Sequence, residues 1–196
     1  DFICIKDWQI KNNWFDDFYR INNAELMYTG VTRTPIFAIC NSVKYNAKTF
    51  NIIPELFSTL SDVYRINGKI NKEFDIDEET DSSHKNSESS YRRLARSFRL
   101  DYKKKDTKFI QGLSKKIMNN QLQKISDNIK FLQKKFSINR NSPVILSGIG
   151  QDILSVYLKN YKTILFKEFI ENKNCNLSKI ASYHAPATCI AHLLEL

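Results

Sequence analysis

The segment from Val144 to Leu154 constrains the fold of this chain more than any other part of it. It contains a short apolar run, a Ser-Gly-Ile-Gly turn and the start of a helix, and a second apolar run follows at 163–166. Two strands that flank a helix imply a right-handed crossover between parallel strands. The sequence therefore predicts an α/β fold with a parallel pair of strands in its last third.

The glycine turn within this segment is also a candidate binding site. Ser147, Gly148 and Gly150 lie between the strand and the helix, where backbone N–H groups and the positive end of a helix can bind a phosphate or a nucleotide. A dinucleotide site is disfavoured because its fingerprint needs a third glycine, which does not follow here. The alternative is that both glycines only allow the helix to pack closely on the strand.

A second candidate site lies in the segment from Tyr28 to Pro35. A glycine, a guanidinium and three hydroxyl groups occur there within six residues, namely Thr29, Gly30, Thr32, Arg33 and Thr34. This combination suits a turn around an anion such as a phosphate. A charged residue in such a segment needs a partner, so Arg33 either binds the anion or forms a structural salt bridge.

The next segment predicts a helix from Glu55 to Arg65 that places carboxylates near this turn. Glu55, Thr59 and Asp62 would share one helical face, and the apolar residues between them would face the core. The two carboxylates could bind a divalent cation such as Mg²⁺. They could equally be ordinary solvent-facing residues.

Apolar periodicity and end signals predict the remaining elements. We expect two short strands within 2–10, a strand at 25–28, a short helix at 36–40, a helix beginning near 87, a long amphipathic helix over 106–136 and a final helix over 185–194. The segment 71–90 is acidic and serine-rich with few apolar residues, so it predicts an exposed loop. Loops of this length are commonly functional or disordered.

The composition favours one soluble domain. With 196 residues, the chain can bury one substantial core. No apolar run is long enough for a transmembrane helix, and no positively charged segment is followed by an apolar stretch and a cleavage site, so we expect a cytoplasmic protein without membrane contact. The net charge is +9, but no nucleic-acid motif accompanies the scattered lysines, so nucleic acid is not the expected partner. The four cysteines form no CxxC pair and predict reduced core residues.

Three blocks of the sequence together resemble a known family. They are Tyr-Thr-Gly-Val-Thr-Arg-Thr-Pro at 28–35, Glu-Leu-Phe-Ser-Thr-Leu-Ser-Asp-Val-Tyr at 55–64 and Arg-Leu-Ala-Arg at 93–96. Their order and spacing resemble the tetrahydromethanopterin-linked C1-transfer-pathway proteins, a branch of the hydantoinase A/oxoprolinase group. The glycine turn and Ala-Pro-Ala-Thr at 185–188 resemble the C-terminal part of that family, so the resemblance covers nearly the whole chain.

The resemblance implies an actin/Hsp70/sugar-kinase fold of the ribonuclease H-like kind, with a mixed sheet and flanking helices. In this fold two α/β lobes close over a phosphate-bearing ligand. Residues 1–196 would form the second, C-terminal lobe, and an absent N-terminal lobe with the phosphate loops would be its partner. Asp1 looks like the last residue of an upstream segment.

The resemblance also implies an activity and its substrates. Members of the family join an aminomethylfuran-methyl diphosphate to the phenol oxygen of γ-glutamyltyramine in methanofuran biosynthesis and release diphosphate. Arg33 and its flanking threonines, with Mg²⁺ on Glu55 or Asp62, would neutralise the diphosphate, or one of these carboxylates would act as the base for the phenol. The alternatives are an ATP-dependent amidohydrolase of the hydantoinase or oxoprolinase kind and a non-catalytic binding module.

The acidic loop departs from the family pattern. That pattern reads Thr-x-Asp-Gly-x-x-Lys, whereas this chain has Thr-Asp-Ser-Ser-His-Lys at 80–85, without the glycine. Asp81 and Lys85 would be the counterparts of the family's aspartate and lysine. We therefore expect a different turn geometry here.

Overall fold

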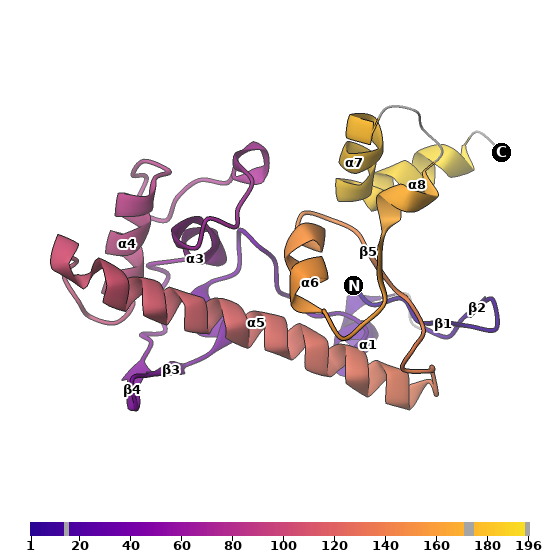
Figure 1. Ribbon diagram of the computed structural model, residues 1–196, viewed down its shortest axis with the longest axis horizontal. Coiled ribbons are helices and arrows are strands. Elements are labelled where there is room, and N and C mark those ends of the chain that lie inside the picture. Colours follow the sequence, from indigo (N-terminus) through magenta and orange to yellow (C-terminus); the bar gives the residue numbers. More distant parts are fainter. Residues whose placement is uncertain (14–15, 171–174, 195–196) are drawn as a thin grey trace. The chain divides into compact units, whose positions relative to one another are not determined.

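The computed structural model describes residues 1–13, 16–170 and 175–194. They group into two compact units, shown within the ribbon of Figure 1. The central unit is Met27–Ile125, and the terminal unit combines Asp1–Leu26 with Ser126–Leu196. The long helix α5 (Thr107–Lys135) contributes its first part to the central unit and its last part to the terminal unit.

The central unit is mainly helical. Its elements before α5 are the helix α2 (Ile36–Ile39), the strands β3 (Ser42–Tyr45) and β4 (Lys48–Asn51), the helix α3 (Leu60–Ile66), the 3-10 turn η1 (Lys72–Phe74), the helix α4 (Ser87–Arg96) and the 3-10 turn η2 (Lys104–Asp106). Helices α3 and α4 lie against each other. Their core residues are fully buried, among them Leu60, Val63 and Leu94.

Helix α5 confirms the long amphipathic helix expected over 106–136. Ile110, Leu113 and Ile117 are at most 1% exposed, and their spacing places them on one face of the helix. Lys115 and Lys116, between Leu113 and Ile117, are exposed. The helix is therefore held by burial of one apolar face.

The hairpin formed by β3 and β4 was not predicted. Its strands pair antiparallel from Ser42↔Asn51 to Tyr45↔Lys48. Asn46 and Ala47 between them have φ values of 46° and 62°, as a tight two-residue hairpin turn requires. The ring of Tyr45 lies against Gly112 of α5, where an added Cβ would be 2.4 Å from the ring. Glycine is thus required for this contact.

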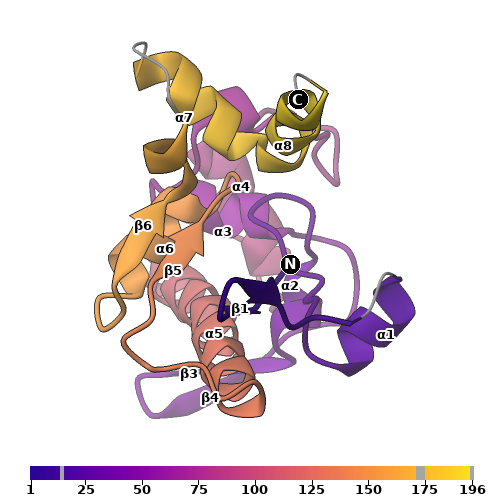
Figure 2. The same ribbon diagram turned by 90° about the vertical axis from the view of Figure 1, so that its right-hand side faces the viewer.

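The terminal unit contains a hairpin, a parallel strand pair and several helices. The elements are β1 (Ile5–Lys6), β2 (Gln9–Ile10), α1 (Asp17–Asn22), β5 (Val144–Leu146), α6 (Gln151–Tyr157), β6 (Thr163–Leu165), the 3-10 turn η3 (Phe166–Phe169), α7 (Cys175–Tyr183) and α8 (Ala185–Leu193). Strands β5 and β6 pair in parallel and are joined through α6 (Figure 2). This confirms the predicted β-α-β connection.

The other element predictions have mixed outcomes. The N-terminal hairpin, the short helix at 36–40 and the helix over 185–194 are confirmed as β1–β2, α2 and α8. The strand predicted at 25–28 is wrong, because the chain bonds locally as it leaves α1: Glu25 N–H donates to the Arg20 carbonyl at 2.8 Å. The described residues form small two-stranded sheets among helices, and the actin-like fold stays a prediction.

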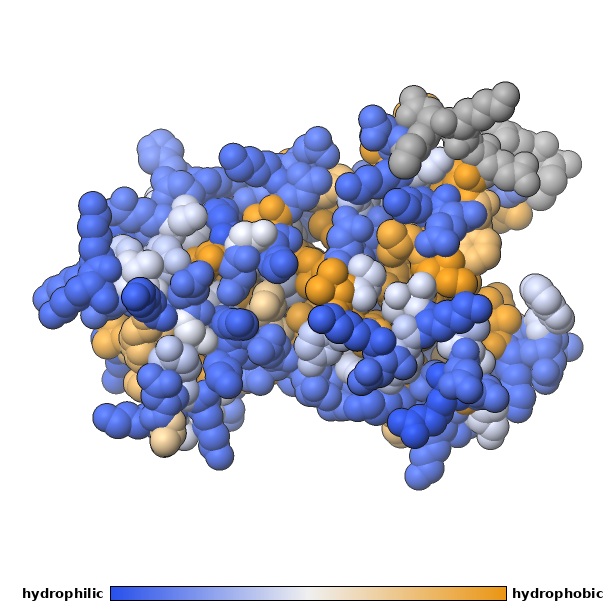
Figure 3. Space-filling model, viewed as in Figure 1, coloured by the Kyte–Doolittle hydropathy of each residue, from blue (hydrophilic) through white to orange (hydrophobic). Residues whose placement is uncertain are grey.

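The surface is mostly hydrophilic on the face shown in Figure 3, with apolar side chains gathered over β5 and α6. Ile145 and Val156 on these elements are 48% and 60% exposed. None of the described helices is both long and apolar enough to cross a membrane.

The cysteines only partly match the expected core positions. Cys4 is buried, Cys40 is half-buried and Cys189 is exposed, and all three are free thiols. The Cys175 side chain lies outside the described part of the chain. Among the residues that are described, no group of three or more His, Cys, Asp or Glu side chains is arranged to hold a metal ion.

Candidate functional site

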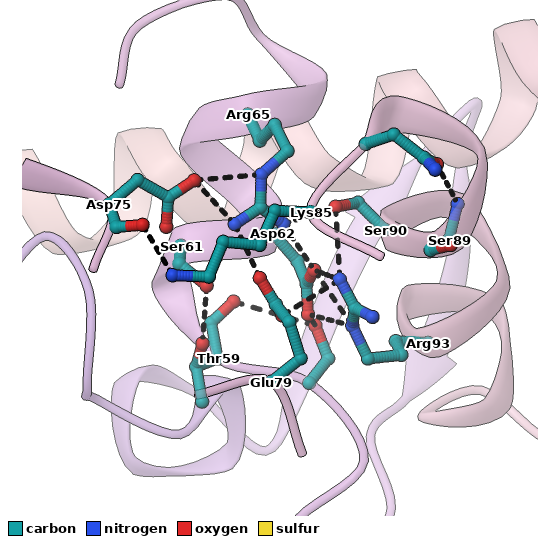
Figure 4. A network of polar contacts seen from close by, with 12 residues as sticks. Thr59, Ser61, Asp62, Arg65, Asp75, Glu79, Lys85, Ser89, Ser90 and Arg93 are labelled. Carbon is teal, nitrogen blue, oxygen red and sulfur yellow. Dashed lines mark hydrogen bonds and ion pairs between the residues drawn. The ribbon is translucent and has the colours of Figure 1, made fainter. Parts of the chain in front are cut away.

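A buried ion network occupies the central unit where α3 lies against α4 (Figure 4). Asp62 on α3 and Arg93 on α4 both have fully buried side chains. Arg93 Nη2 donates to Asp62 Oδ1 at 2.6 Å, and Nε donates to Oδ1 and Oδ2 at 3.0 and 3.1 Å. This forked contact combines charge and directional hydrogen bonds, so it is among the strongest ion pairs that side chains form.

Arg65 extends the network to the acidic segment that follows η1. Its Nη2 donates to Asp75 Oδ2 and to Glu79 Oε1, both at 2.6 Å. Its Nη1 donates to Asp62 Oδ1 at 3.2 Å and to Ser90 Oγ at 2.7 Å. Both carboxyl oxygens of Glu79 are used, because its Oε2 lies 2.8 Å from Arg93 Nη2.

Most residues of the segment 71–86 are exposed, as expected for this loop, but two of its carboxylates are anchored against the helices. The side chains of Asp75 and Glu79 are only 7% and 3% exposed. Asp81 accepts a bond from Arg93 Nη1 at 2.9 Å, and Lys85 donates to the Asp75 carbonyl. The two residues taken as counterparts of the family's aspartate and lysine thus hold this segment against the helices.

Most of the charged groups in this network are paired with a group of opposite charge. Four carboxylates (Asp62, Asp75, Glu79 and Asp81) face the guanidinium groups of Arg65 and Arg93, with Arg96 at 3.5 Å from Asp81. Burial, and secondly the charge of Asp62, raises the pKa of Glu79. The guanidinium groups of Arg65 and Arg93 are thus both engaged by carboxylates, whereas Arg96 is 54% exposed.

The segment Thr32–Pro35 covers the beginning of α3. The Leu60 and Ser61 N–H groups donate to the Thr34 and Thr32 carbonyls at 2.9 and 3.2 Å. These N–H groups have no partner within the helix, so the preceding segment supplies one. The three blocks of the family resemblance thus meet in the central unit: the first covers α3, and the second and third join through Asp62 and Arg93.

The turn at 29–34, called the threonine turn below, already uses several of its polar groups in hydrogen bonds within the protein. Gln121 on α5 donates to Thr29 Oγ1 at 2.7 Å and to the Gly30 carbonyl at 3.1 Å. The Gly30 N–H donates to Thr34 Oγ1 at 2.8 Å. Gln121 also accepts a bond from the buried Tyr64 hydroxyl at 2.5 Å, and burial raises the pKa of Tyr64. The turn is positioned by α5, a contact that the sequence did not indicate.

Arg33 is the exposed cation beside this turn. Its side chain is 82% exposed, and its Nε donates to Asp77 Oδ1 at 2.8 Å. Burial acts to raise the pKa of Asp77, but hydrogen bonds from Thr32 and Arg33 outweigh it and lower that pKa. The salt bridge expected as the alternative for Arg33 is present, and it lies at the surface, where an anionic ligand could replace the carboxylate.

Glu55 and Asp62 do not share a helical face, so this prediction is wrong. Helix α3 begins at Leu60 rather than near residue 55. The backbone before it bonds elsewhere: the Phe57 carbonyl accepts from Thr80 Oγ1 at 2.7 Å, and Thr59 forms a bridge with Pro35. Glu55 is exposed and Asp62 is fully buried.

Asp62 does not suit a metal ion. Both of its oxygens already accept bonds from Arg93, and Ser58 Oγ and Arg65 add further bonds at 3.0 and 3.2 Å. A divalent cation would have to displace two guanidinium groups from a site without water access. The carboxylate pair expected to hold Mg²⁺ is therefore not assembled.

The glycine turn after β5 belongs to the terminal unit, whereas the residues described above belong to the central unit. Gly148 has a φ of 87°, which glycine adopts without strain. Its N–H donates to the Ser182 carbonyl at 2.9 Å. Ser147 is exposed and Gly150 precedes α6. The predicted binding residues thus belong to two compact units.

Comparison with known proteins gives one informative relationship. The chain is 30% identical over all its 196 residues to (4-{4-[2-(gamma-L-glutamylamino)ethyl]phenoxymethyl}furan-2-yl)methanamine synthase of Methanocaldococcus jannaschii. The chain spans 56% of the length of that relative. No protein-family model matches the chain. The similarity supports the methanofuran-biosynthesis part of the resemblance, and the hydantoinase A/oxoprolinase grouping stays a prediction.

Proposed function

We propose that this chain is part of a transferase that forms an aryl-alkyl ether in methanofuran biosynthesis. The observation that carries the proposal is the 30% identity over the whole chain to the M. jannaschii synthase. The contacts among the three sequence blocks around α3 also support it, because the segments that resemble the family in sequence lie together in the structure. The product in the relative's name joins a phenol to a furan through a methylene group.

The chemistry of such a synthase is a substitution at the carbon next to the furan ring. The phenol oxygen of γ-glutamyltyramine forms a bond to this methylene carbon, and the bond from the carbon to the diphosphate oxygen breaks. The diphosphate leaves with the electron pair, and the phenol proton passes to a base. The protein has to stabilise the charge that develops on diphosphate and to accept this proton.

Arg33 is the residue of the central unit that we assign to the diphosphate. It is exposed beside the threonine turn, and its carboxylate partner Asp77 is also partly exposed. The guanidinium can exchange this single carboxylate contact for phosphate oxygens, which a guanidinium can bind in a forked geometry. Arg65 and Arg93, by contrast, are buried and already paired with carboxylates.

Glu55 is the better candidate for the base of the two carboxylates named from the sequence. It is exposed, and the bridge between Pro35 and Thr59 joins its segment to the end of the threonine turn. Asp62 cannot reach a substrate through the network that surrounds it. We assign Asp62 and Arg93 to positioning, since they fix the helix that the threonine turn covers.

The test is to assay the complete protein that contains these 196 residues with the aminomethylfuran-methyl diphosphate and γ-glutamyltyramine. We expect diphosphate release and an ether product, detected by mass spectrometry, that both depend on the phenolic substrate. Absence of both products with folded protein would reject the proposal. ATP hydrolysis stimulated by a cyclic amide would instead indicate an amidohydrolase.

A further inference from the structure

A small pocket lies in the central unit between the end of α4 and the first turns of α5. Its volume is about 130 Å³. The walls are mostly apolar, formed by Ala95, Leu100, Phe109 and Ile110, with Tyr102 beside them. An engineered apolar cavity of about 150 Å³ holds one benzene molecule. The pocket is therefore large enough for a single five-membered aromatic ring.

Two carboxylates line the same pocket. Asp101 is exposed and Asp106 is half-buried. Neither side chain has a hydrogen bond or an ion pair with any described residue. Three lysines at 103–105 separate the two aspartates in the sequence, and none of the three forms an ion pair with either aspartate. The pocket thus combines an apolar floor with negative charge that has no partner.

The aromatic walls are held by neighbouring contacts. Tyr102 stacks on Tyr91 at 5.4 Å between ring centroids, and its hydroxyl lies 2.7 Å from Thr107 Oγ1. Phe109 makes edge contacts with Tyr45 and Phe50 at 5.8 and 5.1 Å. Rings fixed in this way need little ordering when a ligand enters. A cation near Tyr102 would also be attracted to the face of its ring.

We propose that this pocket binds a small flat ring that carries a primary ammonium group, with the ring among Leu100, Phe109 and Ile110 and the ammonium on Asp106 and Asp101. The ligand class follows from size, apolar walls and unpaired negative charge together. A larger bicyclic ring would exceed the volume, and a neutral or anionic ring would leave the carboxylates unpaired.

Within the proposed function, the pocket selects one of the two substrates, and this step rests on that function. The furan part of the product named for the relative ends in a free methanamine on a small ring. The tyramine nitrogen of the other part is tied in an amide, and its remaining ammonium is on the glutamyl end, far from the phenol ring and beside a carboxylate that two aspartates repel. The pocket therefore fits the aminomethylfuran end of the diphosphate substrate.

The test uses furfurylamine as the probe and measures its binding by NMR titration, without any transfer reaction. We expect saturable binding that falls about tenfold or more in Asp106→Asn and in Asp101→Asn, because each change removes a charge-assisted bond. Furfuryl alcohol, which has the ring without the charge, should bind correspondingly more weakly. Asp101 is exposed, so its variant should fold even if Asp106→Asn does not.

The matched control is Glu88→Gln, which removes an exposed carboxylate of α4 that pairs with Arg92. Binding of furfurylamine should be unchanged in this variant. No saturable binding, or binding that both aspartate variants leave unchanged, would overturn the proposal. Binding at the pocket without diphosphate release would support this inference while rejecting the proposed transferase, so the two failures can be told apart.

Discussion

Arg93 and Asp62 face each other from α4 and α3, and neither side chain has any exposed surface. Removal of one partner leaves the other charge buried and unpaired, which is strongly destabilising. We predict that Arg93→Ala lowers the free energy of unfolding by about 3–5 kcal/mol. Urea denaturation followed by circular dichroism measures this change.

The neighbouring Arg92 provides the control for this prediction. It is 60% exposed and pairs with Glu88 one helical turn away. Arg92→Ala should change the free energy of unfolding by no more than about 0.5 kcal/mol. Equal effects of the two alanine variants would show that the Arg93 network does not stabilise the central unit.

The sequence predicted parts of this unit and missed the ion network for a physical reason. The apolar residues of the long helix α5 recur at helical spacing, so the predicted ends of this helix agree with the observed ones. Asp62, however, was expected to share a helical face with Glu55, either as a metal ligand or as an ordinary solvent-facing residue. Its partner Arg93 lies 31 residues away, and a single sequence does not show that α3 and α4 pack together.

The start of α3 shows a related limit of local sequence signals. Pro54 and the acidic Glu55 are typical of a first helical turn, and they predicted the helix too early. The backbone of 55–59 bonds instead to Pro35 and Thr80, which are distant in the sequence. Tertiary contacts thus override the local preference, and the arrangement of the candidate carboxylates changes with them.

The contact between Tyr45 and Gly112 predicts that Gly112→Ala is destabilising in the parent protein and stabilising where Tyr45 is replaced by alanine. An added Cβ at Gly112 would lie 2.4 Å from the Tyr45 ring, so Gly112→Ala should destabilise the protein. In a Tyr45→Ala background the clash is absent, and the same change should stabilise the helix by about 1 kcal/mol. Thermal unfolding of the four variants of this cycle checks the prediction.

A matched control for this cycle is Gly30→Ala. An added Cβ there meets only Thr34 Oγ1, at 4.0 Å, and its backbone is not in the left-handed region. This variant should unfold close to the parent protein. If Gly112→Ala were stabilising in both backgrounds, the packing of Tyr45 on α5 would be incorrect.

The Asp81 carboxyl predicts a loss of stability in acid. Partial burial acts to raise its pKa, but hydrogen bonds from Ser83 and Arg93 outweigh this and lower the pKa below the ordinary value of 3.8. The unfolded chain therefore binds this proton first, so the stabilisation is present above pH 3.8 and is lost as the pH falls below it. Asp81→Asn should flatten the stability profile in this range, as measured by urea denaturation at a series of pH values.

Glu79 gives the opposite pH dependence within the same network. Its pKa is raised above the ordinary value of 4.5, with burial as the main cause. The folded state therefore binds this proton more tightly, and its contribution to stability is lost as the pH rises through the raised pKa. Glu79→Gln should remove this loss above pH 4.5. A carboxyl pKa of Glu79 below that value in an NMR titration would contradict the prediction.

Substitution of Arg33 tests the catalytic proposal with little effect on folding, because the Arg33 side chain is 82% exposed. Arg33→Ala should change the free energy of unfolding by no more than about 0.5 kcal/mol. If Arg33 stabilises the leaving diphosphate, kcat/KM for ether formation should fall by roughly 100-fold, as for the loss of one charge-stabilising donor. Steady-state kinetics with the diphosphate substrate and denaturation of the same protein samples measure both quantities.

The companion variant Asp77→Asn tests the competition at this guanidinium. The substitution weakens the ion pair between Arg33 and this residue while keeping the size of the side chain. Arg33 is then freer to bind phosphate oxygens, so KM for the diphosphate substrate should fall or stay the same, opposite to the effect of Arg33→Ala. Since both residues are at the surface of the central unit, equal losses of activity in the two variants would mean that the pair acts as a structural salt bridge, and the diphosphate would have to bind elsewhere.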